Sequence, residues 1–209
     1  ASAQWKSAGN KMKTSWADKI DVNKVLPEYP RPIMEREQWQ NLNGLWNYAI
    51  LPAGKSAPLT YDGKILVPFP LESSLSGVAK ELGEKNELWY QRDFIVPAKW
   101  SNKKILLNFG AVDWKADIWV NNIKVGQHTG GYTPFSLDIT YALIKGNNKL
   151  VVKVWDPADQ GFQPRGKQVS KPDGIWYTSV SGIWQTVWME PVSEHYITNV
   201  KTTPNIDNN

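Results

Sequence analysis

Apolar and polar residues alternate with a period of two through much of the chain. Such alternation places every second side chain on one face of a strand, so it predicts half-buried β-strands. Within residues 149–155, for example, Leu150, Val152 and Val154 share the face that we expect to point inward. The segments that read most clearly as strands are residues 46–50, 65–67, 88–96, 103–109, 114–120, 134–139 and 182–190.

Turn residues separate these segments. Asn121 and Asn122 lie between residues 114–120 and an apolar return at residues 123–126. Asparagine tolerates a positive φ, which predicts a two-residue hairpin loop here. Apart from one helical turn expected within residues 35–43, almost no helical periodicity is present. Many short strands with turn signals about every 8–12 residues predict an all-β fold, a two-sheet antiparallel sandwich.

The two ends of the sequence differ from the middle. Pro27, Pro30 and Pro32 fix φ and remove backbone donors, so we expect residues 1–36 to form an extended arm across a surface. Residues 195–204 alternate like one more strand without a partner, which indicates a truncated further domain at residues 193–209. A terminal edge strand or a frayed tail is the alternative. The sandwich domain is then expected at residues 37–192.

Composition narrows the class of protein. A chain of 209 residues with 41% hydrophobic and 21% charged residues and a net charge of +4 is expected to fold as a globular domain. No run approaches the roughly 18 consecutive apolar residues of a membrane helix, so we expect no membrane partner. Residues 1–16 lack a signal-peptide pattern, and the missing amino-terminal Met indicates a processed or engineered end. We expect a periplasmic or secreted protein, with the cytoplasm as the alternative.

The basic isoelectric point, about 9.1, does not indicate a nucleic-acid partner. Binding to a phosphate backbone needs lysines and arginines gathered on one face. Here they fall one or two per segment with acids between them, a distribution typical of edge and turn lysines that discourage strand-to-strand association. We therefore expect no nucleic-acid partner.

Metal and cysteine chemistry are also poorly supported by the sequence. The chain has no cysteine, which excludes disulfides, thiolate zinc sites and a cysteine nucleophile. Its two histidines, His128 and His195, lie far apart and have no acidic cluster near them. We expect neither a metal nor a cofactor.

Several motifs resemble the amino-terminal sugar-binding domain of glycoside hydrolase family 2, which includes β-galactosidases, β-glucuronidases and β-mannosidases. The matching stretches follow the family's order from residue 30 to about residue 192. Asn122 stands where the family usually has glycine, a change that the hairpin tolerates. The stretches are PRP at 30–32, LNGLW at 42–46, VPFP at 67–70, WYQRDF at 89–94, FGAVD to VNNIKVG at 109–126, GYTPF at 131–135 and SGIWQ at 181–185.

This resemblance implies a jelly-roll β-sandwich of the galactose-binding type. In the family it is followed by an immunoglobulin-like domain, whose opening residues 195–204 resemble, and by a (β/α)₈ barrel. The parent, the longer protein of which this chain would be one part, would hydrolyse terminal β-glycosidic bonds by the retaining route, with both catalytic carboxyl groups on the barrel. The pair Asn86–Glu87 resembles the family's acid/base motif only superficially, because it precedes a sandwich strand. We therefore assign this chain no catalytic residue and expect it to be inactive alone.

A long polar loop, residues 156–178, is the candidate sugar-binding element. Loops longer than about 12–15 residues are usually functional or disordered. In the family an acid of the corresponding loop helps to hold the terminal sugar, and the resemblance places that role on Asp173. Two extra residues after Trp176 leave Asp156 or Asp159 as alternative positions.

Other side chains of the loop fit the same role. Trp176 could stack on a sugar ring and Arg165 could bind its hydroxyl groups. The alternative is a purely structural one, in which an acid pairs with Arg165 or Lys167 to order the loop. Six further tryptophans lie in alternating strands and are mostly expected in the sandwich core, namely Trp46, Trp89, Trp119, Trp155, Trp184 and Trp188.

These observations lead to a ranked set of functions. The first is a non-catalytic sugar-binding domain whose partners are a carbohydrate with a terminal β-linked sugar and the remaining domains of the parent. A free-standing carbohydrate-binding module is the main alternative, and a sandwich used only for protein interaction is the third. Titration of sugars into the chain separates the first two.

Overall fold

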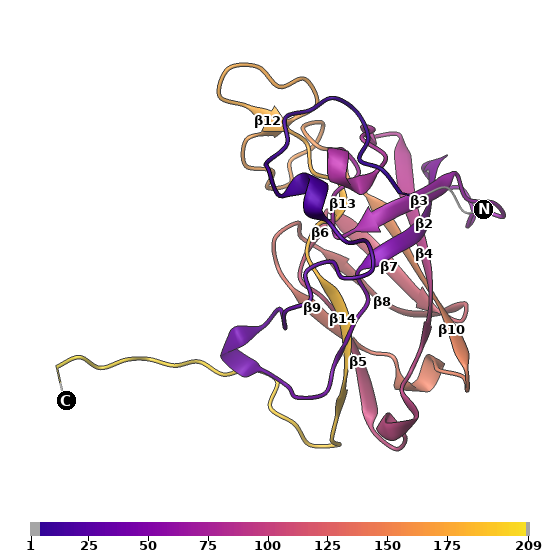
Figure 1. Ribbon diagram of the computed structural model, residues 1–209, viewed down its shortest axis with the longest axis vertical. Helices are drawn as coiled ribbons and strands as arrows, with labels where there is room; N and C mark the ends of the chain where they lie inside the picture. Colours follow the sequence, from indigo (N-terminus) through magenta and orange to yellow (C-terminus); the bar gives the residue numbers. More distant parts are fainter. Residues whose placement is uncertain (1–4, 208–209) are drawn as a thin grey trace.

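Two antiparallel sheets make up the body of the computed structural model, which describes residues 5–207 (Figure 1). The six-stranded sheet has the order β3 (Gly63–Val67), β2 (Gly44–Pro52), β4 (Asn86–Ile95), β10 (Asn147–Trp155), β7 (Lys115–Val120), β8 (Ile123–Thr129). The four-stranded sheet has the order β1 (Gln40–Asn41), β14 (Val187–Val192), β5 (Lys104–Phe109), β9 (Phe135–Asp138). The chain is a jelly-roll β-sandwich, as the sequence predicts.

Short elements complete the fold. β6 (Val112–Asp113) pairs with β13 (Gly182–Ile183), and β11 (Gln168–Val169) pairs in parallel with β12 (Tyr177–Thr178). The helices of the described residues are single turns of the 3₁₀ type: η1 (Ala17–Lys19), η2 (Pro32–Met34), η3 (Ser74–Ser76), η4 (Ala98–Trp100) and η5 (Thr140–Ala142). None of them is long and apolar enough to cross a membrane.

The core lies between the inner faces of the two sheets. Leu150, Val152 and Val154 of β10 are fully buried there, which confirms the face predicted from their alternation. Trp46 and Tyr90 meet edge to face at a centroid distance of 6.2 Å within the same core. Asn121 and Asn122 adopt φ of 50° and 67° and join β7 to β8, so the predicted hairpin is confirmed.

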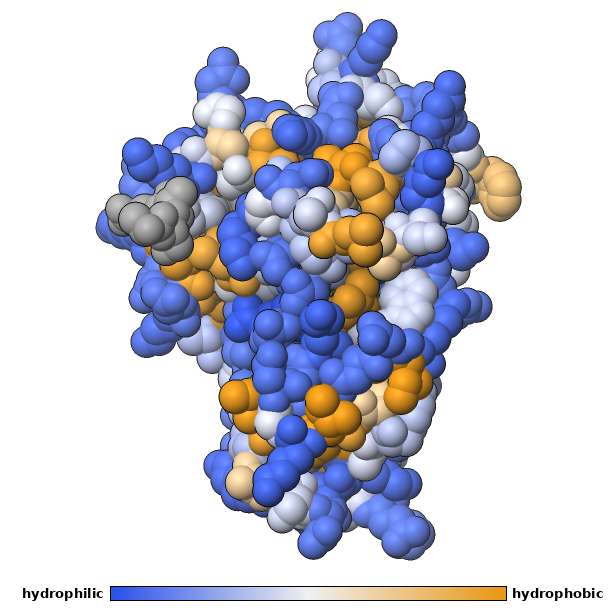
Figure 2. All heavy atoms as spheres, turned by 90° about the vertical axis from the view of Figure 1, so that its right-hand side faces the viewer, coloured by the Kyte–Doolittle hydropathy of each residue, from blue (hydrophilic) through white to orange (hydrophobic). Residues whose placement is uncertain are grey.

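The prediction for the strand tryptophans holds for some of them and not for others. Trp46, Trp89 and Trp188 are buried, whereas Trp119, Trp155 and Trp184 are only partly buried. Of the six, only Trp46 belongs to the cluster between the sheets. Trp89 follows Leu88 and precedes Tyr90, and because both of these point inward, Trp89 lies on the opposite face, where it stacks on Trp119 at 5.9 Å. The side of the molecule shown in Figure 2 carries hydrophobic patches interrupted by hydrophilic residues.

Three local predictions need correction. The helical turn lies at Pro32–Met34, while Gln40 and Asn41 pair with β14 as a strand. The strand expected at residues 182–190 is broken at residues 184–186, where the chain passes from pairing with β6 to pairing with β5. Residues 195–204 form no strand: Tyr196 and Ile197 contact Arg36, and the chain then runs away from the sandwich (Figure 1).

The amino-terminal arm is anchored by a buried acid. Glu190 of β14 is fully buried and forms salt bridges with Arg31 and Arg36. Tyr29 donates its hydroxyl to the same carboxylate at 2.8 Å, and Trp188 donates its indole N–H at 3.1 Å. Residues 29–36 of the arm are therefore held against the four-stranded sheet by charged hydrogen bonds.

Candidate functional site

The long loop between β10 and β13 projects from one end of the sandwich (Figure 1). Its first acid, Asp156, is buried and accepts hydrogen bonds from Ser181 Oγ at 2.7 Å and from the Ala158 N–H at 2.8 Å. Because Ser181 lies at the far end of the loop, this bond closes its base. Asp156 thus lies beneath the loop and not on its surface.

Asp159 and Arg165 come together in the first half of the loop. The Asp159 carboxylate accepts hydrogen bonds from Ser170 Oγ and Gln160 Nε2, and its backbone carbonyl accepts one from Arg165 Nη1 at 2.7 Å. The hydrogen bond from Ser170 holds the pKa of Asp159 below its ordinary value. These contacts order the loop internally.

Asp173 and Trp176 lie at the exposed tip. The Asp173 carboxylate accepts the Gly174 N–H at 2.8 Å, and its backbone carbonyl accepts the Trp176 N–H at 3.1 Å, which closes a tight turn. The Trp176 side chain is 42% exposed. Ile175 and Tyr177 are more exposed still, so the tip presents apolar surface beside an acid.

The five predicted site residues therefore fall into three places. The structure brings Asp173 to Trp176 and Asp159 to Arg165, and it places Asp156 at the base. Among residues 5–207, neither Arg165 nor Lys167 forms a salt bridge with a loop acid. Lys167 lies instead over the ring of Tyr177 at 6.0 Å.

Two further acids are buried beside the loop base, and the sequence analysis missed both. Glu72 accepts the Ser181 N–H at 2.9 Å, and Asp113 accepts a hydrogen bond from Gln168 Nε2 at 3.3 Å. Burial, reinforced by the nearby Asp156 carboxylate, raises the pKa of each to about 7. Asp113 lies in the FGAVD motif, which was the available signal; nothing in the sequence connects Glu72 to Ser181.

The Asn86–Glu87 pair has a structural role in this sheet. Lys153 Nζ lies 3.2 Å from Glu87 Oε1 and 3.3 Å from Asp117 Oδ2, so one ammonium group bridges both carboxylates. Glu87 also accepts the Gly54 N–H. Glu87 is therefore occupied by contacts within the sheet. No group of three potential metal ligands occurs within the described part of the chain.

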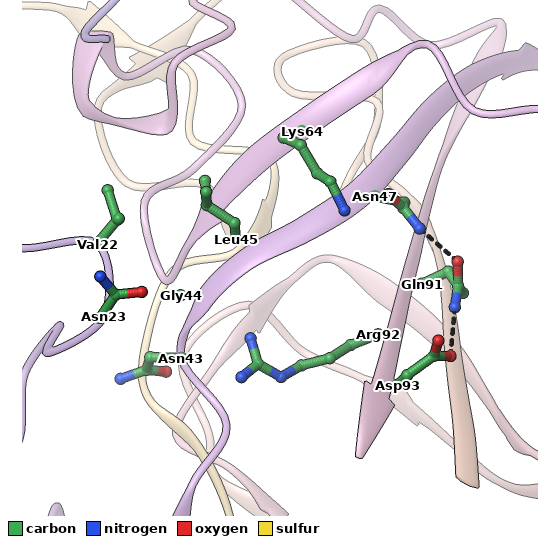
Figure 3. A pocket seen from close by; sticks show the side chains of 10 residues that line it. All are labelled: Val22, Asn23, Asn43, Gly44, Leu45, Asn47, Lys64, Gln91, Arg92 and Asp93. Atoms are coloured by element: carbon green, nitrogen blue, oxygen red, sulfur yellow. Dashed lines mark hydrogen bonds between the residues drawn. The ribbon is translucent and has the colours of Figure 1, made fainter. Parts of the chain in front are cut away.

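A polar cavity of about 390 Å³ lies where β2 begins and β4 approaches its end (Figure 3). Three asparagines, a glutamine, two cations and one carboxylate contribute to its wall. Arg92 of the WYQRDF motif reaches across it toward Asn43 and Gly44 (Figure 3). Because Leu88 and Tyr90 point inward, the alternation of the strand also places Arg92 on its inner face. An arginine at such a position was the available signal in the sequence.

The fold and the loop define a β-sandwich that presents an ordered polar loop at one end. The family model described as "Glycosyl hydrolases family 2, sugar binding domain" matches residues 66–190, more than half of the chain. The chain belongs to this family, which confirms the resemblance of its motifs.

Individual relatives agree with this assignment. The chain is 28% identical to the β-glucuronidase of Paenibacillus borealis over 132 residues, covering 60% of this chain and 22% of that protein. It is 33% identical to the β-galactosidase of Thermoanaerobacter pseudethanolicus over 114 residues, covering 54% and 14%. The solved structure of the Lactobacillus rhamnosus β-glucuronidase matches with a TM-score of 0.62 at 27% identity, covering 79% and 30%. The chain thus spans less than a third of each.

Proposed function

We propose that this chain is the non-catalytic, amino-terminal sugar-binding domain of a parent enzyme that hydrolyses terminal β-glycosidic bonds by the retaining route. The loop at residues 156–181 would border the active site of that parent. The observation that carries the proposal is the contrast within the loop, whose base is closed by Asp156 and Ser181 while Asp173 and Trp176 stay exposed at its tip.

The tip has the chemistry of one wall of a sugar site. An indole face packs on the C–H groups of a sugar ring, and a carboxylate accepts hydrogen bonds from hydroxyl groups. Beside them, Ile175 and Tyr177 expose apolar surface that a neighbouring domain would cover. The relatives that match this chain carry the names β-glucuronidase and β-galactosidase, and this supports a terminal β-linked sugar as the substrate.

The test is the substitution Asp173→Asn in the full-length parent. This change keeps the shape of the side chain but weakens it as an acceptor of hydroxyl hydrogen bonds. We expect kcat/KM to fall by the equivalent of roughly 1–3 kcal/mol, the range for losing one charged hydrogen bond.

Matched variants give the control and the alternatives. Asp18→Asn, at an exposed position in η1, should leave kcat/KM unchanged. If activity survives Asp173→Asn but not a change at Asp156 or Asp159, the sugar-binding acid is that other residue of the loop. Full activity in all three variants would show that the loop is not part of the active site.

The chain alone should not hydrolyse nitrophenyl β-glycosides. Retaining hydrolysis needs two carboxyl groups about 5–5.5 Å apart, one protonated and one ionised. We assign those groups to the barrel of the parent, so release of nitrophenol should stay at background level at every pH. Release that Glu87→Gln abolishes would contradict this expectation.

A free-standing carbohydrate-binding module is the second candidate, favoured by the exposed Trp176. Galactose or mannose binding to this chain alone, lost in Trp176→Ala, would support it.

We place residues 193–209 at the start of an immunoglobulin-like domain of the parent and the parent itself in the periplasm or outside the cell.

A further inference from the structure

The polar cavity lies where two neighbouring strands separate. β2 and β4 pair from Asn47 opposite Gln91 to Pro52 opposite Asn86. Before that point β2 pairs with β3 alone, and beyond Gln91 the residues of β4 pair only with β10. The cavity fills the gap between the diverging strands, and it shares no residue with the loop at residues 156–181.

Arg92 is an unpaired cation at this cavity. No salt bridge joins it to an acid of the described residues, and its buried Nε has no hydrogen-bond partner there. Its guanidinium lies over the Trp46 ring at 5.9 Å, and a Cβ on Gly44 would come within 3.3 Å of Nη1. The indole and the backbone at Gly44 thus define where the guanidinium lies.

The other polar groups of the wall are ordered as well. Asn47 donates to Gln91, and Gln91 donates to Asp93 at 2.7 Å, so the amide of Gln91 has one fixed orientation (Figure 3). Lys64 extends from β3 over the same space and forms no salt bridge within residues 5–207 (Figure 3). Two cations face one carboxylate, and the wall is left with a net charge of +1.

We propose that this cavity binds a sugar that carries a carboxylate, a uronic acid. The planar fork of an arginine matches a carboxylate through two parallel hydrogen bonds, and Lys64 adds a second positive charge. Amide side chains both donate and accept, which suits sugar hydroxyl groups. The volume lies in the range of small-molecule sites, about 300–1,000 Å³.

A second cavity supports a saccharide ligand over a simple anion. It measures about 250 Å³ and shares Asn23, Asn43 and Arg92 with the first, so the two meet at the guanidinium. The second cavity includes the ring of Trp39, which is only partly buried. An aromatic ring beside the arginine offers a stacking surface for a neighbouring sugar unit and none for a free phosphate.

The test is isothermal titration of this chain with D-glucuronate, D-glucose and inorganic phosphate. We expect glucuronate to bind in the millimolar range and glucose and phosphate to bind roughly tenfold more weakly or not at all. Lys64→Gln should weaken glucuronate binding several-fold, whereas Lys145→Gln, the same charge change at an exposed turn, should have no effect.

A conservative variant tests the arginine while a basic side chain remains at position 92. Arg92→Lys keeps the charge but removes the fork, so it should reduce glucuronate affinity roughly tenfold while the thermal unfolding temperature shows that the domain is folded. Absence of glucuronate binding at tens of millimolar would overturn the proposal. Equal affinity for glucuronate and phosphate would also overturn it. The same holds if glucuronate affinity falls in Trp176→Ala and not in the Lys64 and Arg92 variants, because the sugar would then bind at the loop.

Discussion

Two glutamates with almost no solvent exposure, Glu190 and Glu72, lie in very different surroundings. Glu190 meets two arginines and accepts further hydrogen bonds from Tyr29 and Trp188. Glu72 accepts the Ser181 N–H, while its Oε1 has no hydrogen-bond partner within the described residues, and no cation forms a salt bridge with it there.

The difference shows two ways of accommodating a buried acid. Removing a carboxylate from water is costly, and the charge persists only where cations and donors replace the lost hydration. The surroundings of Glu190 supply both. Around Glu72 the nearby Asp156 adds a second negative group, and burial raises the pKa of Glu72 from 4.5 to about 7. One carboxylate lies among cations and hydrogen-bond donors, and the other is a carboxyl group whose pKa is raised to about 7.

The largest expected effect comes from Glu190→Gln. The change leaves Arg31 and Arg36 facing a neutral amide in a partly buried setting. We expect the free energy of unfolding, measured by urea denaturation, to fall by about 3 kcal/mol, the lower end for broken buried pairs because both arginines retain some exposure. Glu194→Gln, an exposed change nearby, is the control. A loss no larger than that of the control would show that the arm is held by other contacts.

Glu72→Gln should have a smaller effect of opposite sign. Because its pKa is higher in the folded state, the folded chain binds the proton more tightly, and stability falls as pH rises from about 4.5 to about 7. Glutamine removes that loss, so the variant should be more stable than the unsubstituted chain by roughly 1–3 kcal/mol above pH 7 and no more stable below pH 4.5.

Urea titrations at pH 4 and pH 8 measure this difference. Glu81→Gln, at an exposed position, should show no pH-dependent gain. A Glu72→Gln variant that loses stability at pH 8 would mean that the surroundings of Glu72 stabilise its ionised carboxylate.

Asp173→Asn in the isolated chain should have the smallest effect. Asp173 is exposed, and among residues 5–207 its carboxylate accepts a hydrogen bond only from the adjacent Gly174 N–H. Substitutions at such positions usually change stability by no more than about 0.5 kcal/mol, so the thermal unfolding temperature should stay within about 2 °C. A clear decrease would support the structural role of this acid over the sugar-binding one.

Local sequence patterns were sufficient to predict most of the sandwich. Alternation identified the inner face of β10, and the Asn121–Asn122 pair identified the β7–β8 hairpin, because strand faces and tight turns depend on neighbouring residues. The expectation for Trp89 rested on the size of its side chain, and it failed because apolar residues occur on both faces of β4.

The candidate site was harder to predict because its contacts are long-range. Ser181 is separated from Glu72 by 109 residues and from Asp156 by 25, and no local pattern connects them. The cavity at Arg92 has a similar origin, since it depends on where two strands stop pairing. Sequence motifs indicated that residues 89–94 matter, but only the structure shows that the arginine has no acid partner within residues 5–207.

The pairing of the first strand with the last has a consequence for synthesis. β1 hydrogen-bonds to β14, and Arg31 meets Glu190 across 159 positions of sequence, so both belong to the contacts of highest sequence separation in the chain. A ribosome delivers residue 31 long before residue 190. Residues 29–41 must therefore wait undocked until the final strand has emerged, and the four-stranded sheet is completed only at the end of translation of the domain.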